Sequence, residues 1–211
     1  MSEKLETRSI KCSGLQVRKD GESDKPAVIE GYAMRFDEES VYLTSYGEKF
    51  VEIMDRQCYS QEKADKTDIK MTLFHNREKL LARSDKGTGS MTLTVDDQGL
   101  KFSFEVPDTE FGKFAEEAVR RGDIKGCSIG FMTNEYDTST RLNDAEKDTY
   151  DVVVRQKDIE IFELTLESDP AYTSTSVELR GKENVSEMLD KQKAADADAL
   201  YLRKLCNRIY Y

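Results

Sequence analysis

The chain has 211 residues, the length of one domain with a short appendage. Its 42 acidic and 32 basic side chains give a formal net charge of −10, which argues against a protein built to bind nucleic acid phosphates. No apolar run approaches the length of a membrane span, and no apolar signal segment follows Met1. The sequence therefore predicts a soluble, intracellular protein with no nucleic acid or membrane partner.

An N-terminal strand and a charged connector are predicted for residues 1–27. Strands follow at 28–36 and 69–75, where apolar and β-branched residues run between turn signals. Residues 90–95 and 100–106 alternate apolar with polar side chains on either side of a short Gly-containing turn. This pattern predicts a hairpin with one buried face.

A helix is predicted after Pro107-Asp108-Thr109, because apolar residues then recur at helical spacing. Asp108 or Thr109 can cap its start, and Gly122 can cap its end. Further along, strands are predicted at 127–133, 150–156 and 159–166, with a polar loop at 134–148. The predicted fold class is α+β, mainly β. About seven strands would form either a small β-barrel-like core or a two-sheet domain, with at least one central helix and a C-terminal amphipathic helix.

The C-terminal segment differs in kind from the rest. From Val185 to Ile209, apolar or small residues recur at helical spacing with no Pro or Gly between them, which predicts one amphipathic helix. This helix could pack on the domain as a terminal core element, or it could be a removable segment that docks a partner. The predicted division of the chain is an N-terminal strand and connector at 1–27, a main domain at 28–180 and a helical tail at 181–211.

The four cysteines are spread along the chain, at Cys12, Cys58, Cys127 and Cys206. This spacing fits no metal-site pattern, and a reducing compartment disfavours disulfides. The chain also has a single histidine, His75, so a zinc site would need ligands from distant segments. We expect neither a metal nor a cofactor.

His75 and Ser128 are candidates for a general base and a nucleophile. An imidazole titrates near neutral pH and can therefore take a proton, although a half-buried strand-end histidine without a catalytic role has the same pattern. Ser128 lies between Gly126 and Gly130, which lets backbone N–H groups approach a bound carbonyl. The motif follows a helix and enters a strand, the reverse of the α/β-hydrolase elbow, so that fold does not explain it. Cys127 is an alternative nucleophile, but neighbours on a strand point to opposite faces, so only one of the two can meet His75.

A cluster of acidic residues near the last predicted strand offers a third member for a catalytic triad. Its members are Glu160, Glu163, Glu167 and Asp169. Strand alternation places Glu163 on the face opposite Leu164 and its apolar neighbours, and Glu160 on their face. Because either face of a barrel wall could hold the site, alternation does not choose among the acids.

Several short segments together carry a family resemblance. They are Ile29-Glu30-Gly31-Tyr32-Ala33, Leu73-Phe74-His75-Asn76, Val106-Pro107-Asp108-Thr109, Arg120-Arg121-Gly122-Asp123, Gly126-Cys127-Ser128-Ile129-Gly130-Phe131, and Phe162-Glu163-Leu164-Thr165 leading to Asp169-Pro170-Ala171-Tyr172. Their order and spacing, over about residues 28–178, resemble the prohead (capsid maturation) serine proteases of tailed bacteriophages. Members of that family are similar in fold to herpesvirus assembly proteases and trim scaffold from capsid proteins inside the immature shell.

The resemblance implies a Ser-His-Glu endopeptidase with Ser128 as the nucleophile, His75 as the base and Glu163 as the third member. Backbone N–H groups of Ile129 and Gly130 are candidates for the oxyanion hole, and no cofactor is required. The implied substrates are a capsid precursor or scaffold and the protease itself, cut in the host cytoplasm inside the assembling prohead. A homo-oligomer is left open. Two alternatives also stay open: a Cys127–His75 thiol protease of the same fold, and a non-catalytic capsid-assembly or scaffold-binding module.

Overall fold

A computed structural model describes residues 6–10, 13–18, 26–40, 42–45, 48–144 and 149–168. The chain divides into two compact units, Met1–Val177 and Glu178–Tyr211, and every described residue belongs to the first. The predicted amphipathic helix in 181–211 lies outside the described residues, as does Asp169.

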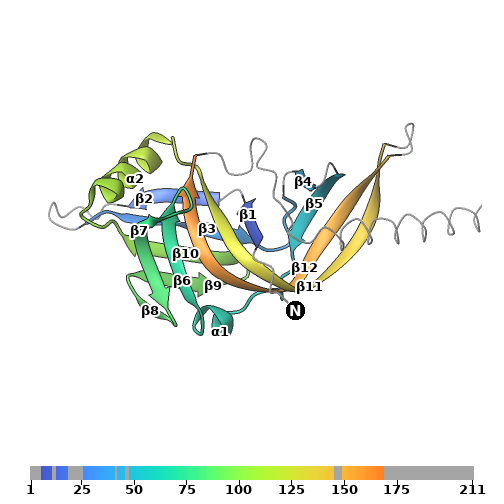
Figure 1. The fold of residues 1–211 in the computed structure, drawn as a ribbon, viewed down its shortest axis with the longest axis horizontal. Helices are drawn as coiled ribbons and strands as arrows, with labels where there is room; N and C mark the ends of the chain where they lie inside the picture. The colour runs from blue at the N-terminus through green and yellow to red at the C-terminus, as the bar shows by residue number, and fades with distance from the viewer. Residues whose placement is uncertain are drawn as a thin grey trace, which may run out of the picture. The chain divides into compact units, whose positions relative to one another are not determined.

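Two β-sheets make up most of the first unit (Figure 1). The larger sheet has eight strands, and its main path runs in the order β1, β11, β12, β6, β7, β8. The strands are β1 (Glu6–Ile10), β11 (Gly126–Asp144), β12 (Thr149–Glu167), β6 (Asp68–Leu73), β7 (Asn76–Asp85) and β8 (Thr88–Gly89), joined by β5 (Glu48–Met54) and β4 (Leu43–Ser45). β12 is central, because it pairs antiparallel with β11 along one edge and parallel with β5 and β6 along the other.

The smaller sheet has four strands in the order β2, β3, β10, β9. Its strands are β2 (Ser13–Arg18), β3 (Val28–Arg35), β10 (Gly99–Glu105) and β9 (Met91–Val95). The predicted strand at 28–36 and the predicted hairpin are thus confirmed. Leu100, Phe102 and Phe104 alternate along β10 and are buried, as the sequence pattern predicted.

The hydrophobic core joins the apolar faces of the two sheets. Ile29 and Phe102 enter it from the smaller sheet, and Phe131 and Ile161 enter it from the larger one. The predicted α+β, mainly β class is confirmed. The described strands form two sheets and no closed barrel, so the two-sheet alternative is confirmed and not the barrel-like one, with more strands than the seven expected. Each sheet buries one face against the other instead, as in a two-layer fold.

Two helices occur in the described part of the chain, α1 (Gln61–Ala64) and α2 (Glu110–Arg121). The predicted caps of the longer helix are confirmed. The Thr109 hydroxyl accepts a hydrogen bond from the Gly112 N–H at 3.1 Å, and Gly122 ends the helix with a φ of +77° in the left-handed region. α2 buries Ala115, Ala118 and Val119, so one stripe of the helix belongs to the core.

The long β11–β12 hairpin differs from the prediction. The expected polar loop is wrong for residues 134–144, because β11 continues to Asp144, and residues 145–148 lie outside the described residues. The two strands expected at 150–156 and 159–166 are one strand. Most side chains at 134–143 face solvent, so this part of β11 reads as a polar loop in the sequence. It is a strand because its backbone hydrogen bonds are made with β12. Figure 1 shows both strands bending midway. β5 pairs with residues 152–156 of β12, before the bend, and β6 pairs with residues 163–166, after it.

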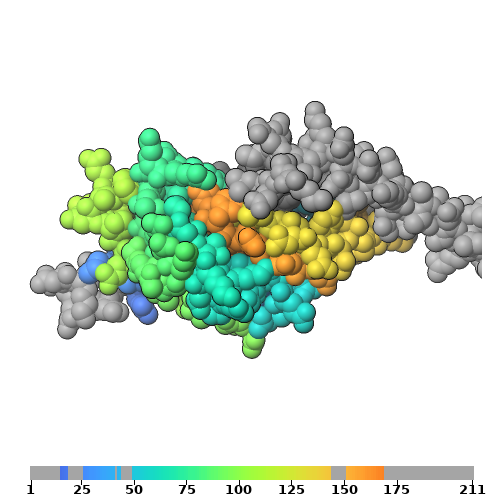
Figure 2. Space-filling model, turned by 60° about the horizontal axis from the view of Figure 1, so that its bottom comes forward, coloured from blue at the N-terminus to red at the C-terminus, as the bar shows by residue number. Residues whose placement is uncertain are grey.

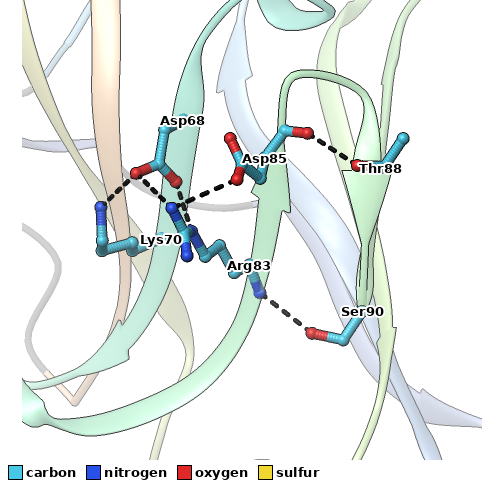
Figure 3. Close-up of polar contacts among 6 residues, drawn as sticks. All are labelled: Asp68, Lys70, Arg83, Asp85, Thr88 and Ser90. Carbon is cyan, nitrogen blue, oxygen red and sulfur yellow. Dashed lines mark hydrogen bonds and ion pairs between the residues drawn. The ribbon is translucent and has the colours of Figure 1, made fainter.

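A cluster of charged side chains ties β6 to β7 at the end of their hairpin (Figure 3). Asp68 accepts hydrogen bonds from Arg83 Nε (2.6 Å) and Nη2 (2.9 Å) and from Lys70 Nζ (2.7 Å). The bond from Arg83, followed by that from Lys70, holds the pKa of the Asp68 carboxyl below its usual range. The Arg83 N–H also donates to Ser90 Oγ at 3.1 Å. Because these side chains are partly exposed to solvent, the ion pairs are expected to add little to the stability of the fold.

Candidate active site

His75 lies in a two-residue turn between β6 and β7. Leu73 and Asn76 pair on either side of the turn, and Phe74 and His75 between them have positive φ values of 55° and 54°. Positive φ at both central residues is typical of a type I′ hairpin turn, in which Asn and Gly are the usual residues. Residues held in this region cost of order 1–3 kcal/mol each, and such strain clusters at functional sites. The strand predicted through residue 75 therefore ends at Leu73.

Hydrogen bonds to β12 hold this turn in place. The Phe74 N–H donates to the Leu166 carbonyl at 3.1 Å, and the His75 N–H donates to Thr165 Oγ1 at 2.9 Å. The Thr165 hydroxyl in turn donates to the Thr72 carbonyl at 3.2 Å. Thr165 is fully buried, so it links the turn to both strands without access to water.

The His75 ring contacts the carboxylate of Glu163. The distance from His75 Nδ1 to Glu163 Oε2 is 3.2 Å, and the hydroxyl of Thr72 donates to Glu163 Oε1, also at 3.2 Å. A carboxylate only accepts hydrogen bonds, so Nδ1 carries the proton, and Nε2 of the neutral ring is left as the basic nitrogen. About a third of the His75 side chain is exposed (34%), against 11% of Glu163.

The contact changes the pKa of both partners. The hydrogen bond to Glu163 raises the pKa of His75, and the charges of Glu167 and Glu163 add to this, although burial of the ring opposes it. The same hydrogen bond lowers the pKa of Glu163 against the effect of burial. The site therefore favours an imidazolium next to a carboxylate, which is the charge state that a base needs after it has taken a proton.

Ser128 lies on β11, across one strand from the turn. It pairs with Thr165 in the β11–β12 ladder, and Thr165 pairs with Thr72 of β6. Residues paired in this way share a face of the sheet, so Ser128 lies on the face that also carries Glu163. Figure 2 shows the surface of β12 between those of β11 and of the β6–β7 hairpin.

Cys127 lies on the other face. It pairs with Leu166, and both residues belong to the hydrophobic core. The prediction that Cys127 and Ser128 point to opposite faces of the sheet is confirmed. The thiol faces the core, and Ser128 lies on the face of His75's partner Glu163.

A β-bulge explains why simple strand alternation predicted the wrong sheet face for Glu160 relative to Glu163. Gly130 pairs with Glu163, but the next residue of β11, Phe131, pairs with Ile161, so Phe162 is an extra residue in β12. The bulge reverses the alternation. Ile161 and Leu164 consequently both belong to the core, and Glu163 lies on the opposite face.

The other predicted acids occupy different places. Glu160 pairs with Met132 beyond the bulge, on the same face as Glu163, and is exposed; the expectation that it shares the face of Leu164 is wrong. Glu167 pairs with Gly126 at the end of β12 and acts on His75 through its charge. Asp169 is outside the described residues.

Ile129 and Gly130 lie near the start of β11, where the strand is paired on both sides. Ile129 pairs with Leu164 and Arg8, and Gly130 pairs with Glu163 and Thr7. Gly130 has a packing reason to be glycine, because an added Cβ would lie 2.7 Å from the ring of Phe162. Both candidate oxyanion residues therefore have their backbones in the ladders of an interior strand.

Thr72 and Thr165 are site residues that the sequence reasoning missed. Each is a fully buried polar residue that neighbours core residues of its strand. The sequence signal for them was weak: Thr165 lies inside a segment that carried the family resemblance, and Thr72 directly precedes another.

Neither a metal cluster nor a membrane helix is found in the part of the chain that the structure describes. No group of three or more His, Cys, Asp or Glu side chains there could hold a metal ion. No helix among the same residues combines the length and the apolar character needed to cross a membrane.

Comparison with known protein families identifies a match over most of the chain. The family model of the caudovirus prohead serine proteases matches residues 13–191 of the 211. Neither curated proteins nor solved structures gave a match to the chain. The family match takes in both sheets except for β1, and it includes the turn that carries His75, Ser128 in β11 and Glu163 in β12. On the extent of this match, the chain belongs to the caudovirus prohead serine protease family.

Proposed function

We propose that the chain is a serine endopeptidase in which Ser128 is the nucleophile, His75 the general base and Glu163 the residue that orients and charges the imidazole. The observation that carries this proposal is the 3.2 Å contact between His75 Nδ1 and Glu163 Oε2 on the sheet face of Ser128. With Nδ1 bound to the carboxylate, Nε2 is the nitrogen that can exchange a proton with a serine hydroxyl.

In the proposed reaction, Ser128 Oγ bonds to the carbonyl carbon of the substrate while His75 Nε2 takes the hydroxyl proton. The tetrahedral intermediate then loses its amine as the peptide C–N bond breaks and the imidazolium returns the proton to the leaving nitrogen. Water, deprotonated by His75, attacks the acyl-enzyme and releases the new carboxylate and Ser128. Glu163 keeps its negative charge throughout and stabilises the imidazolium, in line with the raised pKa of His75.

The family supports a substrate from the immature capsid. We propose that the peptide bonds cut are those of a capsid precursor or scaffold and of the protease itself, inside the assembling prohead in the host cell. The non-catalytic alternative, a capsid-assembly or scaffold-binding module, has no comparable observation in its favour, because a purely structural domain does not need a histidine in a strained turn against a carboxylate.

Co-expression with the capsid precursor, followed by intact mass measurement, tests the proposal. Wild type should shorten the precursor, and Ser128→Ala should stay folded but lose cleavage by a factor on the order of 10⁶. His75→Ala should lose about as much, because the two residues act as a unit. Residual activity of Ser128→Ala within about tenfold of wild type would contradict the assignment.

Cys127→Ala is the matched control for the neighbouring residue. Since its thiol faces the core, this variant should keep its activity, with at most a modest loss of stability. The thiol-protease alternative predicts the reverse, namely loss of activity in Cys127→Ala and on treatment with iodoacetamide. A wild-type chain that cuts no precursor at all would favour the non-catalytic module.

A further inference from the structure

Strand β1 occupies the edge of β11 next to Ser128. It runs antiparallel to β11, with Ser9 opposite Ser128 and Thr7 opposite Gly130. β1 is also the terminal strand on this path of the sheet order, so β11 separates it from β12 and the His75 turn (Figure 1). The N-terminal strand therefore runs directly alongside the proposed nucleophile.

This pairing uses backbone groups that a protease site needs. Along a strand, successive N–H groups point alternately to the two neighbouring strands. Of the three N–H groups from Ser128 to Gly130, at least one is therefore directed at β1 and the rest at β12. Ser128 itself is fully buried. In this arrangement a substrate carbonyl has neither a free donor nor an open approach to the hydroxyl.

An extended peptide would fit the same edge. Peptides commonly bind by adding a strand to a sheet edge, where main-chain hydrogen bonds give affinity and alternate side chains give specificity. A strand paired with β11 lies about 4.7–4.9 Å from it. The backbone carbonyl groups of a docked peptide would therefore lie next to Ser128. β1 shows that β11 accepts an antiparallel strand at this register.

We propose that substrate peptides dock as an extended strand on the β11 edge, and that β1 holds this place in the resting chain and must leave before cleavage. The proposal rests on the proposed function, since it concerns access to Ser128. Departure of β1 would turn β11 into an edge strand and release an N–H group beside Ser128 for the oxyanion. Ile129 and Gly130 could then serve as expected from the sequence.

The family comparison supports a separable role for β1. The match begins at residue 13, so β1 precedes it, whereas β2, β11 and β12 lie inside it. A strand outside the shared part of the chain can leave without removing any element of that part. The larger sheet would then end at β11, beside the proposed nucleophile.

The register offers a way to lock β1 in the full chain. Ile10 lies opposite the native Cys127, so Ile10→Cys places two thiols across the β1–β11 pair, where a disulfide can form under mild oxidation. Access to Ser128 is read with a fluorophosphonate probe, which bonds to the serine oxygen as fluoride leaves, and activity is read with a peptide substrate. Intact mass and peptide mapping identify the bond, and wild type with the same oxidant is the control for the other cysteines.

We expect the oxidised Ile10→Cys variant to label and cleave at least about tenfold more slowly than the same protein after reduction. Wild type should respond to neither treatment. The reason is that the apparent affinity for the probe or the substrate is proportional to the fraction of molecules in which the β11 edge is free, and the disulfide lowers this fraction. A chain without residues 1–12 should do the opposite and label about tenfold faster than wild type, with a melting temperature within a few degrees. A synthetic peptide of residues 4–12 should compete with the substrate in this shortened chain, raising KM while kcat stays the same.

Two outcomes would overturn the proposal: a mapped disulfide that leaves both rates unchanged, or a folded shortened chain that labels no faster than wild type. Ser128→Ala in each background separates this failure from failure of the proposed function. If the full chain cleaves through Ser128 but is indifferent to β1, only the docking proposal fails. If neither chain labels nor cleaves, the proposed function fails as well.

Discussion

Ser128 and Thr165 lie opposite each other in β11 and β12, and the hydroxyl of Thr165 accepts a hydrogen bond from the backbone N–H of His75 at 2.9 Å. Thr165 is thus the residue through which the strand of the nucleophile and the turn of the base are joined. Its hydroxyl hydrogen is directed at the carbonyl of Thr72, so both capacities of the group are used. This buried side chain, together with the bond from the Phe74 N–H to the Leu166 carbonyl, therefore helps to fix the position of the base relative to the nucleophile.

Thr165→Val keeps the shape of this side chain and removes both bonds. Loss of these two hydrogen bonds at a buried position should lower the free energy of unfolding by about 1–3 kcal/mol. A small displacement of His75 should lower kcat by roughly 10²-fold. Thr165→Ser is the matched control, because it retains the hydroxyl and should recover most of kcat. Wild-type kcat in Thr165→Val would show that the bond does not position the base.

The glycine after the serine is predicted to be a packing residue. In Gly130→Ala the new methyl group would lie 2.7 Å from the ring of Phe162, closer than real Cβ contacts. We expect a loss of stability of about 1–3 kcal/mol, measured by urea unfolding, because the bulged residue cannot move without disturbing the Glu163 pair. Phe162→Leu in the same chain should restore part of the loss. Equal losses in the single and double variants would contradict the packing explanation.

The sequence predicted the elements that have local signals. It did not predict the elements whose existence or geometry depends on pairing with a distant strand. Thr109, Gly122 and the alternating residues of β10 each carry their own cue, so α2 and the β9–β10 hairpin were predicted closely. Residues 134–144 of β11 have no apolar alternation, since most of them face solvent, and only their pairing with β12 makes them a strand. The Phe162 bulge and the Phe74-His75 turn lack the Gly or Asn that usually marks such geometry. His75, Ser128 and Glu163 were found through the order of motifs, whereas Thr72 and Thr165 needed the strand register.

The tail remains a prediction from the sequence, and the family match refines its test. We expect residues beyond 180 to form a removable, partner-facing helix, but the match continues to residue 191. Chains 1–180, 1–191 and 1–211 should be compared for melting temperature, peptide cleavage and co-assembly with capsid precursor. The two shortened chains should stay folded and active and fail to co-assemble, because an amphipathic helix binds through its apolar stripe. Unfolding of 1–180 alone would assign residues 181–191 to the catalytic unit.

The coupling of His75 to Glu163 predicts how activity depends on pH. The base must be neutral to take the Ser128 proton, so kcat/KM should fall as pH drops through the pKa of His75. Since Glu163 raises this pKa, the midpoint should lie above the ordinary value of 6.5. Glu163→Gln should lower the rate by roughly 10⁴-fold. It should also move the midpoint to lower pH. Without the negative charge of Glu163, less opposes the effect of burial, which lowers the pKa of His75. Glu160→Gln, the matched control on the same face, should leave both unchanged. A larger effect of Glu160→Gln would assign the triad acid to that residue.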